Sequence, residues 1–225
     1  MCGIFGYIGN KTAYNEVYNG LKKLEYRGYD SCGISVIDRG KFKTLKKVGA
    51  PEELKDKSKS KSTIGIGHTR WATHGVVNVK NAHPHISKDG NIVVVHNGVV
   101  ENADQFHYDL KSDTDSEVLA NLIADEYTLD LGKAVSRALE KVEGTYGIAV
   151  MHRDDPKTIV AARRGSPLCI GISGDNSETY IASDTYALPQ EISRVIYLED
   201  GHVATITADN LHIHKADRSI EYSHK

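Results

Sequence analysis

Short apolar runs of strand length, set between turn residues, constrain the fold of this chain more than any other feature. The run Ile92-Val93-Val94-Val95 is typical, because it is long enough for a strand and far too short to span a membrane. Such runs predict strands at residues 2–8, 33–37, 42–48, 64–69, 92–96, 146–151, 158–162, 168–172, 179–182, 195–198, 202–206 and 211–213. We therefore expect β-sheets to form the framework.

Helices interrupt the strands at only a few places. Helical spacing of apolar residues predicts helices at 13–26 and 131–142, a short one at 51–57, and another that begins near Asp115. Strands that precede and follow a helical pair favour an α+β layering over a βαβ alternation. No internal repeat and no linker rich in Pro, Gly or Ser interrupts the sequence, so we expect residues 1–225 to form a single domain.

Composition and cysteine usage limit the possible functions. Lys and Arg number 28 against 30 Asp and Glu, and this balance argues against a nucleic-acid binder or an acidic-membrane binder. The three cysteines, Cys2, Cys32 and Cys169, are odd in number and widely spaced, as free thiols in a reducing cytosol would be. No basic segment followed by an apolar one opens the chain, so we expect no secretory signal and a cytoplasmic location.

The start of the chain offers a nucleophile. Cys2 follows the initiator methionine, and removal of Met1 would leave a thiol and a free α-amine on one residue. An α-amine with a pKa of about 8 can accept the thiol proton directly or through water, so a single residue would supply both the nucleophile and the base. The alternative is that Cys2 is a small buried residue at the start of a strand.

A second candidate site lies in the string HTRWATHG at residues 68–75. Arg70, Thr73 and His74 stand at a predicted strand end, where they could bind a carboxylate through a guanidinium fork and two side-chain donors. Zinc binding is an alternative because five histidines fall between positions 68 and 96. However, neither H-E-x-x-H nor a cysteine at ligand spacing occurs there, and purely structural histidines are a further alternative.

The third candidate is Asn97-Gly98, which follows a buried strand. One side-chain amide and one backbone N–H at such a position can stabilise a developing oxyanion. Asn-Gly is also a common hairpin turn, so both interpretations stay open from these residues alone.

Taken together and in order, these segments resemble the glutaminase domain of the glutamine–fructose-6-phosphate aminotransferase family, within the N-terminal-nucleophile hydrolases. The strings that carry the resemblance are CGIFG (2–6), LEYRGYDS (24–31), HTRWATHG (68–75), VHNG (95–98), TD (114–115), ARRGSPL (162–168) and IASD (181–184). Other amidotransferases, such as asparagine synthetase and the purine amidophosphoribosyltransferase, share the Cys-Gly-Ile start and the Asn-Gly pair. The strings YRGYDS and TRWATH single out the sugar enzyme.

The resemblance implies a four-layer αββα sandwich of two stacked, largely antiparallel sheets between helical layers. It implies Cys2 as the nucleophile with Asn97 and Gly98 as the oxyanion hole. The substrate-binding residues that it implies are Arg70, Thr73 and His74 for the α-carboxylate of glutamine, Asp115 with Gly98 for its α-ammonium, Trp71 lining the site and His83 supporting the pocket. It places Arg27 and Tyr29 in loops that face the sugar-binding half.

L-glutamine is the implied substrate, and the products are glutamate and ammonia. The implied partners are C-terminal sugar-isomerase domains or a synthase subunit. The complete enzyme could form a homodimer. No metal and no cofactor is expected. Two further interpretations remain, namely the glutaminase half of another amidotransferase and an inactive regulatory or assembly module.

The sequence departs from the family in two respects. Family members continue into two sugar-isomerase-type domains, whereas this chain stops at Lys225, so we expect no transfer to fructose 6-phosphate by this chain alone. The family also has a longer helix between Asn102 and Ser112. Here residues 103–106 replace most of it and residues 107–111 are expected to keep a strand, which leaves the support of Asp115 in question.

Overall fold

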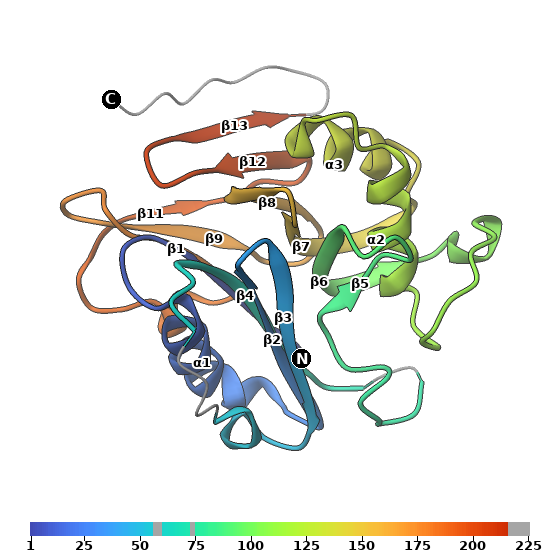
Figure 1. Cartoon of the computed structure of the whole chain (residues 1–225), viewed down its shortest axis with the longest axis horizontal. Helices are drawn as coiled ribbons and strands as arrows, with labels where there is room; N and C mark the ends of the chain where they lie inside the picture. The colour runs from blue at the N-terminus through green and yellow to red at the C-terminus, as the bar shows by residue number, and fades with distance from the viewer. Residues whose placement is uncertain (56–59, 73–74, 216–225) are drawn as a thin grey trace.

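The computed structural model describes residues 1–55, 60–72 and 75–215, whose strands form two sheets packed face to face (Figure 1). The first sheet contains, in spatial order, β11 (Ile192–Tyr197), β9 (Cys169–Ser173), β10 (Thr179–Ala182), β1 (Gly3–Ile8), β4 (Ile64–Arg70), β2 (Ser31–Asp38) and β3 (Lys41–Val48). The second contains β13 (Leu211–Lys215), β12 (His202–Ile206), β8 (Asp155–Arg164), β7 (Gly144–His152), β6 (Ile92–Val100) and β5 (His85–Ile86). Neighbouring strands in both sheets pair antiparallel.

Both faces of each sheet are covered, and this explains why the apolar runs are continuous. In β1, Ile4 and Ile8 pack into the core between the sheets. Phe5 and Tyr7 point to the opposite face, where they pack against helix α1 (Ala13–Leu24). Side chains on a strand alternate between faces, so a strand buried on both sides needs an apolar residue at nearly every position.

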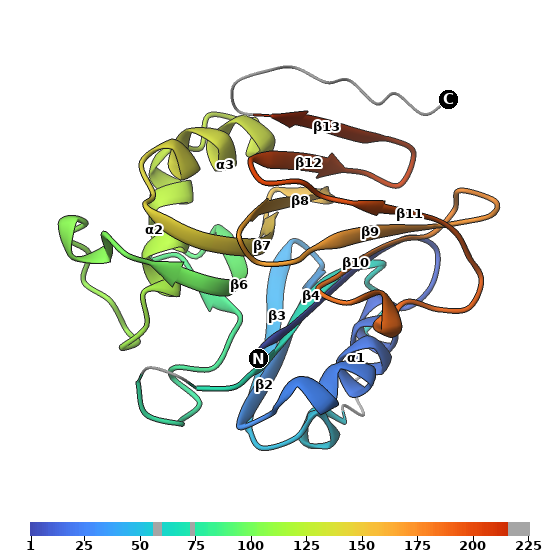
Figure 2. The same ribbon diagram turned by 180° about the vertical axis from the view of Figure 1, so that it is seen from behind.

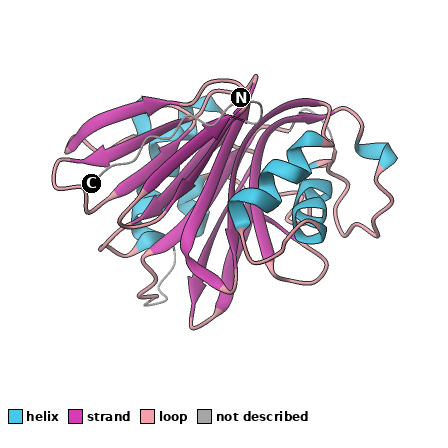
Figure 3. Ribbon diagram, turned by 90° about the horizontal axis from the view of Figure 1, so that it is seen from above, coloured by secondary structure: helices cyan, strands magenta, loops and turns pink. Residues whose placement is uncertain are grey.

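Helices lie on the two outer faces of this pair of sheets. Helix α1 contacts β1 and β4 of the first sheet, while α2 (Ser116–Asp125) and α3 (Leu131–Glu140) cover the second sheet over β6, β8 and β12 (Figures 2 and 3). The prediction of an α+β, four-layer αββα sandwich is thereby confirmed. None of the described helices is long and apolar enough to cross a membrane.

The structure differs from the local sequence pattern at three places. Residues 107–111 form no strand, and the backbone N–H groups of Lys111 and Ser112 donate to the Glu117 carboxylate instead of a ladder. Asn97-Gly98 is not a turn, because β6 continues to Val100 and stays paired with β7. The two-residue strand β5, which pairs with β6, was not predicted at all.

The topology brings four chain segments to one end of the sandwich. The pairing of β1 with β4 places Gly3 opposite Thr69, so Cys2 lies beside Arg70 at the strand ends. The last residues of β6 and the start of α2 meet at the same end, and the pocket described next lies among these segments.

Candidate active site

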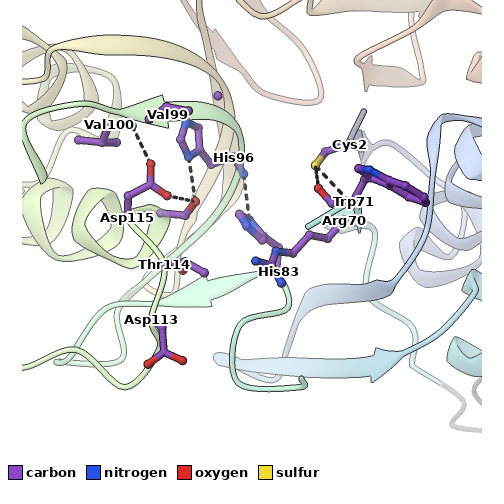
Figure 4. Close-up of a pocket in the computed structure, with 12 residues that line it drawn as sticks. Cys2, Arg70, Trp71, His83, His96, Val99, Val100, Asp113, Thr114 and Asp115 are labelled. Carbon is purple, nitrogen blue, oxygen red and sulfur yellow. Dashed lines mark hydrogen bonds between the residues drawn. The ribbon is translucent and has the colours of Figure 1, made fainter. Parts of the chain in front are cut away.

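A cavity of about 260 Å³ opens at this end of the sandwich, between the two sheets and the start of α2 (Figure 4). It is lined by Cys2, Arg70, Trp71, His83, His96, Gly98, Val99, Val100, Asp113, Thr114, Asp115 and Ser116. Cys2 and Asp115 lie on opposite sides of it, with His83 between them. The sequence-predicted residues Cys2, Arg70, Trp71, His83, Gly98 and Asp115 therefore meet in one place.

The sulfur of Cys2 contacts the backbone of Trp71. The Trp71 N–H donates to Sγ at 3.3 Å, and the thiol faces the Trp71 carbonyl oxygen at 3.6 Å. Burial raises the pKa of the Cys2 thiol, while the Trp71 N–H acts in the opposite direction. The thiol is therefore protonated at neutral pH, and attack on a substrate requires a base that removes its proton.

Arg27 holds the backbone of the nucleophile. Its Nε donates to the Cys2 carbonyl oxygen at 3.1 Å, and its Nη1 lies 3.2 Å from Asp184 Oδ2. The ammonium group of Met1 donates to the Arg27 carbonyl oxygen at 2.7 Å. Sequence reasoning assigned Arg27 to a loop facing a sugar-binding half and gave no indication of this contact with Cys2.

The predicted oxyanion donors lie next to the nucleophile. Asn97 Nδ2 donates to the Cys2 carbonyl oxygen at 3.2 Å, and Asn97 Oδ1 lies 2.9 Å from Nε2 of His68. Gly98 follows with a φ of +133° and lines the cavity. The side-chain amide thus contacts the backbone of Cys2, and the next residue lines the same cavity as Cys2.

The segment after β4 is fixed by the tyrosine-rich string at residues 24–31. The N–H of Asp30 donates to the Arg70 carbonyl oxygen at 2.8 Å, and the Asp30 carboxylate accepts from the N–H of Ala72. The Trp71 ring lies against Gly28, where a Cβ would come within 2.6 Å of the indole. These contacts explain why two separate motifs belong to one site. The predicted ligands Thr73 and His74 lie outside the described residues.

Asp115 is held in place despite the short segment before it. Its Oδ2 accepts from the N–H of Val100 at 2.7 Å. The preceding residues are tied to α2, because the Glu117 carboxylate accepts from the N–H groups of Lys111 and Ser112 at 2.9 and 2.6 Å. The shortened segment therefore leaves the aspartate supported.

A second set of contacts fixes the same segment from the other side. Asn81, fully buried, accepts from the N–H of Asp113 at 2.9 Å and donates to the Asp113 carboxylate at 3.2 Å. Thr114 Oγ1 lies 3.0 Å from Nε2 of His85. Sequence reasoning missed Asn81, Asp113 and Thr114, although Thr114 stood beside the predicted Asp115.

Four buried histidines cluster at the cavity, two of them in its lining and two packed against the ring of His83. They are His68, His83, His85 and His96, and burial lowers the pKa of each, to about 3 for His68. These imidazoles are therefore neutral at pH 7. Among the described residues, no group of three His, Cys, Asp or Glu side chains is arranged to hold a metal ion. His68 and His96 were not predicted as site residues, although both belong to strings that carry the resemblance.

Comparison with known proteins identifies relatives of the chain. It is 47% identical over 227 residues to glutamine–fructose-6-phosphate aminotransferase (isomerizing) of Chlorobaculum tepidum, covering 93% of this chain and 36% of that protein. It is 45% identical to the enzyme of the same name from Neisseria meningitidis serogroup A, covering 94% and 36%. The chain thus spans about a third of the length of these relatives.

A solved structure and a family profile also match this chain. Glutamine phosphoribosylpyrophosphate amidotransferase from B. subtilis, solved with ADP and GMP, matches with a TM-score of 0.77 and 28% identity over 96% of this chain and 49% of that one. The sequence profile of a family described as a glutamine amidotransferase domain matches residues 52–222. Because this profile matches most of the chain, the chain belongs to the glutamine amidotransferase domain family.

Proposed function

We propose that this chain hydrolyses the side-chain amide of L-glutamine to glutamate and ammonia, with Cys2 as the nucleophile. The observation that carries the proposal is one cavity that holds a thiol, a guanidinium and a carboxylate, from Cys2, Arg70 and Asp115. A zwitterionic amino acid needs a cation for its carboxylate and an anion for its ammonium, and glutamine adds an amide for the thiol to attack.

In the proposed complex, each charged group of glutamine has a partner of opposite charge. Arg70 binds the α-carboxylate with its guanidinium fork, assisted by Thr73 and His74. Asp115 binds the α-ammonium together with Gly98. Trp71 lines the cavity, and His83 supports its floor.

The first half of the reaction forms a thioester. After removal of Met1, the α-amine of Cys2 accepts the thiol proton and the sulfur attacks the amide carbon of glutamine. The carbonyl oxygen becomes an oxyanion, which is stabilised by the Asn97 side-chain amide and the Gly98 N–H. The α-ammonium then gives its proton to the leaving nitrogen, the C–N bond breaks, and ammonia leaves.

The second half returns the enzyme to its starting state. Water gives a proton to the Cys2 α-amine as it attacks the thioester carbon, and the C–S bond breaks. Glutamate leaves, and the thiolate recovers its proton from the amine.

The proposal extends to the complete protein. Residues 1–225 form one glutaminase domain, and its ammonia is used for glucosamine-6-phosphate synthesis from fructose 6-phosphate by sugar-isomerase domains or a synthase subunit. Support comes from relatives named as glutamine–fructose-6-phosphate aminotransferases, at 47% and 45% identity. Free Cys2, Cys32 and Cys169 are in keeping with a cytoplasmic protein.

Glutamate release from glutamine by the purified chain tests the function directly. Cys2→Ala should abolish turnover and Cys2→Ser should leave only a trace, because an amine with a pKa of about 8 barely ionises a hydroxyl. Cys32→Ala is the matched control and should keep its activity, since burial raises the pKa of Cys32 to about 12 and the residue lies outside the cavity. Full activity in Cys2→Ala would contradict the mechanism.

The same preparations separate the remaining alternatives. Intact-mass analysis should show a chain without Met1; retention of Met1 together with no turnover would favour an inactive regulatory module. The reading frame that follows the codon for Lys225 tests the acceptor. Sugar-isomerase domains there would support fructose 6-phosphate, whereas a phosphoribosyltransferase-type domain would indicate another amidotransferase.

A further inference from the structure

A hydrogen bond between His68 and Asn97 joins the two sheets next to the backbone of Cys2. His68 lies on β4 of the first sheet and Asn97 on β6 of the second. His68 Nε2 and Asn97 Oδ1 are 2.9 Å apart, and the histidine is fully buried. The orientation of the Asn97 amide is therefore linked to a residue outside the cavity lining.

The contacts of Asn97 determine which ring nitrogen of His68 carries the proton. The Cys2 carbonyl oxygen, 3.2 Å from Asn97, can only accept, so the NH2 group of the amide must face Cys2. The amide oxygen then faces His68 and can only accept, so the proton lies on His68 Nε2. His68 Nδ1 is buried and has no hydrogen-bond partner among the described residues, as suits the nitrogen without a proton.

The surroundings keep this ring neutral and fixed in orientation. Burial lowers the pKa of His68 to about 3, so Nε2 donates its single proton at any pH at which an N-terminal amine could act as a base. The ring of His83 stacks on that of His68 with centroids 4.1 Å apart and planes 19° from parallel. Nδ1 of His83 in turn accepts from the backbone N–H of His96 at 3.2 Å, next to Asn97.

We propose that His68 is a positioning residue for the oxyanion hole: its Nε2–H holds Asn97 Oδ1 away from the cavity and so keeps the Asn97 NH2 group directed toward Cys2. This inference rests on the proposed glutaminase activity. An amide turned by 180° would present its oxygen to the developing oxyanion, and two partial negative charges would then repel each other in the transition state. Glutamine binding, which precedes that charge, would be unaffected.

Kinetics of two His68 variants test this role. His68→Met removes the donor and keeps an apolar side chain of comparable length, whereas His68→Gln offers an amide N–H near the position of Nε2. We expect kcat of His68→Met to fall about 10- to 100-fold with KM unchanged, and His68→Gln to recover most of the loss. A raised KM with unchanged kcat, or equal losses in both variants, would overturn the proposal.

A double-mutant cycle with Asn97→Ala distinguishes positioning from general support. If His68 acts through Asn97, His68→Met should lower kcat in the native background but have no further effect in the Asn97→Ala background. An equal loss in both backgrounds would mean that His68 supports the fold and does not position the amide.

A measurement that does not depend on activity keeps the two proposals separate. Nitrogen-15 NMR of the full chain at pH 7 should show His68 with Nε2 protonated and Nδ1 unprotonated. The opposite tautomer or a cationic ring would overturn the role of His68 even if glutamine is hydrolysed. Conversely, the expected tautomer in a native chain that hydrolyses no glutamine would contradict the proposed function and leave the His68–Asn97 geometry standing.

Discussion

The carboxylate of Asp115 accepts a hydrogen bond from the backbone N–H of Val100 at 2.7 Å, which ties the residue before α2 to the end of β6. The resemblance implies one role for Asp115, as the partner of a substrate ammonium, and its place at the N-cap position of α2 offers a second, as the capping residue of that helix. The side chain makes no capping hydrogen bond to α2, so the second role does not apply. The carboxylate instead lines the cavity opposite Cys2.

Asp115→Asn tests the first role. Asparagine can still accept from Val100, so the midpoint of thermal unfolding should not change. The proposed α-ammonium contact loses its counter-charge, and we expect KM for glutamine to rise at least about tenfold, a loss of about 1.4 kcal/mol. Steady-state kinetics and a thermal melt of the same sample check both parts.

Asp109→Asn is the matched control for this change. Asp109 is 89% exposed, does not line the cavity and lies 3.8 Å from Lys88 in a surface ion pair, so its loss should leave KM unchanged. A stable Asp115→Asn variant with native KM would mean that another acidic residue binds the ammonium.

Arg70→Ala should act on substrate binding. Arg70 is buried at the end of β4 and lines the cavity, and its proposed contact with the α-carboxylate exists in the ground state and the transition state alike. We expect KM to rise about 10- to 100-fold with a smaller change in kcat, in line with about 1.5–3 kcal/mol for a hydrogen bond to a charged group. Arg70→Lys, which keeps the charge without the fork, should give an intermediate KM.

Asn97→Ala should give the opposite kinetic pattern. Its amide is proposed to contact the oxyanion only as charge develops, so kcat should fall roughly 10²- to 10³-fold with a modest change in KM. Initial rates over a range of glutamine concentrations separate the two parameters. If Asn97→Ala raised KM and Arg70→Ala lowered kcat, the two roles would have to be exchanged.

Much of the fold follows from local pattern, because most strands bury both faces and most helices bury one. Tertiary pairing overrides that pattern at Asn97-Gly98, where a strong turn signal lies inside β6 because β7 offers partners as far as Val100. The strand expected at residues 107–111 is absent for a related reason. At the end of that segment the Glu117 carboxylate accepts from the backbone N–H groups of Lys111 and Ser112, so these groups are not free for a ladder.

Some residues of the site could be predicted from the sequence, and others could not. The residues proposed to act on the substrate, such as Cys2, Arg70 and Asp115, belong to recognisable sequence motifs. Their supports come from distant segments: His68 reaches Asn97 across two sheets, and Asn81 fixes Asp113. Such contacts depend on how the sheets stack, which no local pattern in a single sequence specifies.

The buried histidines predict a loss of stability in acid. In the unfolded chain their pKa is about 6.5, whereas burial lowers the pKa of His68 to about 3 and lowers those of His83, His85 and His96 as well. Below pH 6.5 the unfolded state therefore binds more protons, and the free energy of unfolding falls as the pH falls. His68 alone should contribute about 2 kcal/mol of loss between pH 7.5 and pH 5.

Urea unfolding at pH 7.5, 6 and 5 measures this loss. His68→Gln should flatten the dependence on pH by about one proton, because glutamine does not titrate. Equal free energies of unfolding at pH 7.5 and pH 5 would show that the imidazoles are accessible to protons in the folded state.

Gly98→Ala tests how strictly the backbone of the proposed oxyanion hole is fixed. Gly98 has a φ of +133°, and a Cβ there would lie 2.1 Å from the carbonyl oxygen of Thr145 on β7. That oxygen is backbone and cannot move without breaking the β6–β7 pairing, so we expect a loss of more than about 3 kcal/mol in unfolding free energy or no folded protein.

Gly90→Ala is the matched control: its φ is +75°, but a Cβ would have no neighbour within 4 Å, so only about 1–2 kcal/mol of backbone strain should appear. Equal unfolding free energies for the two variants in urea would mean that β6 can shift at Gly98, and that the oxyanion site is more adaptable than the Gly98–Thr145 contact implies.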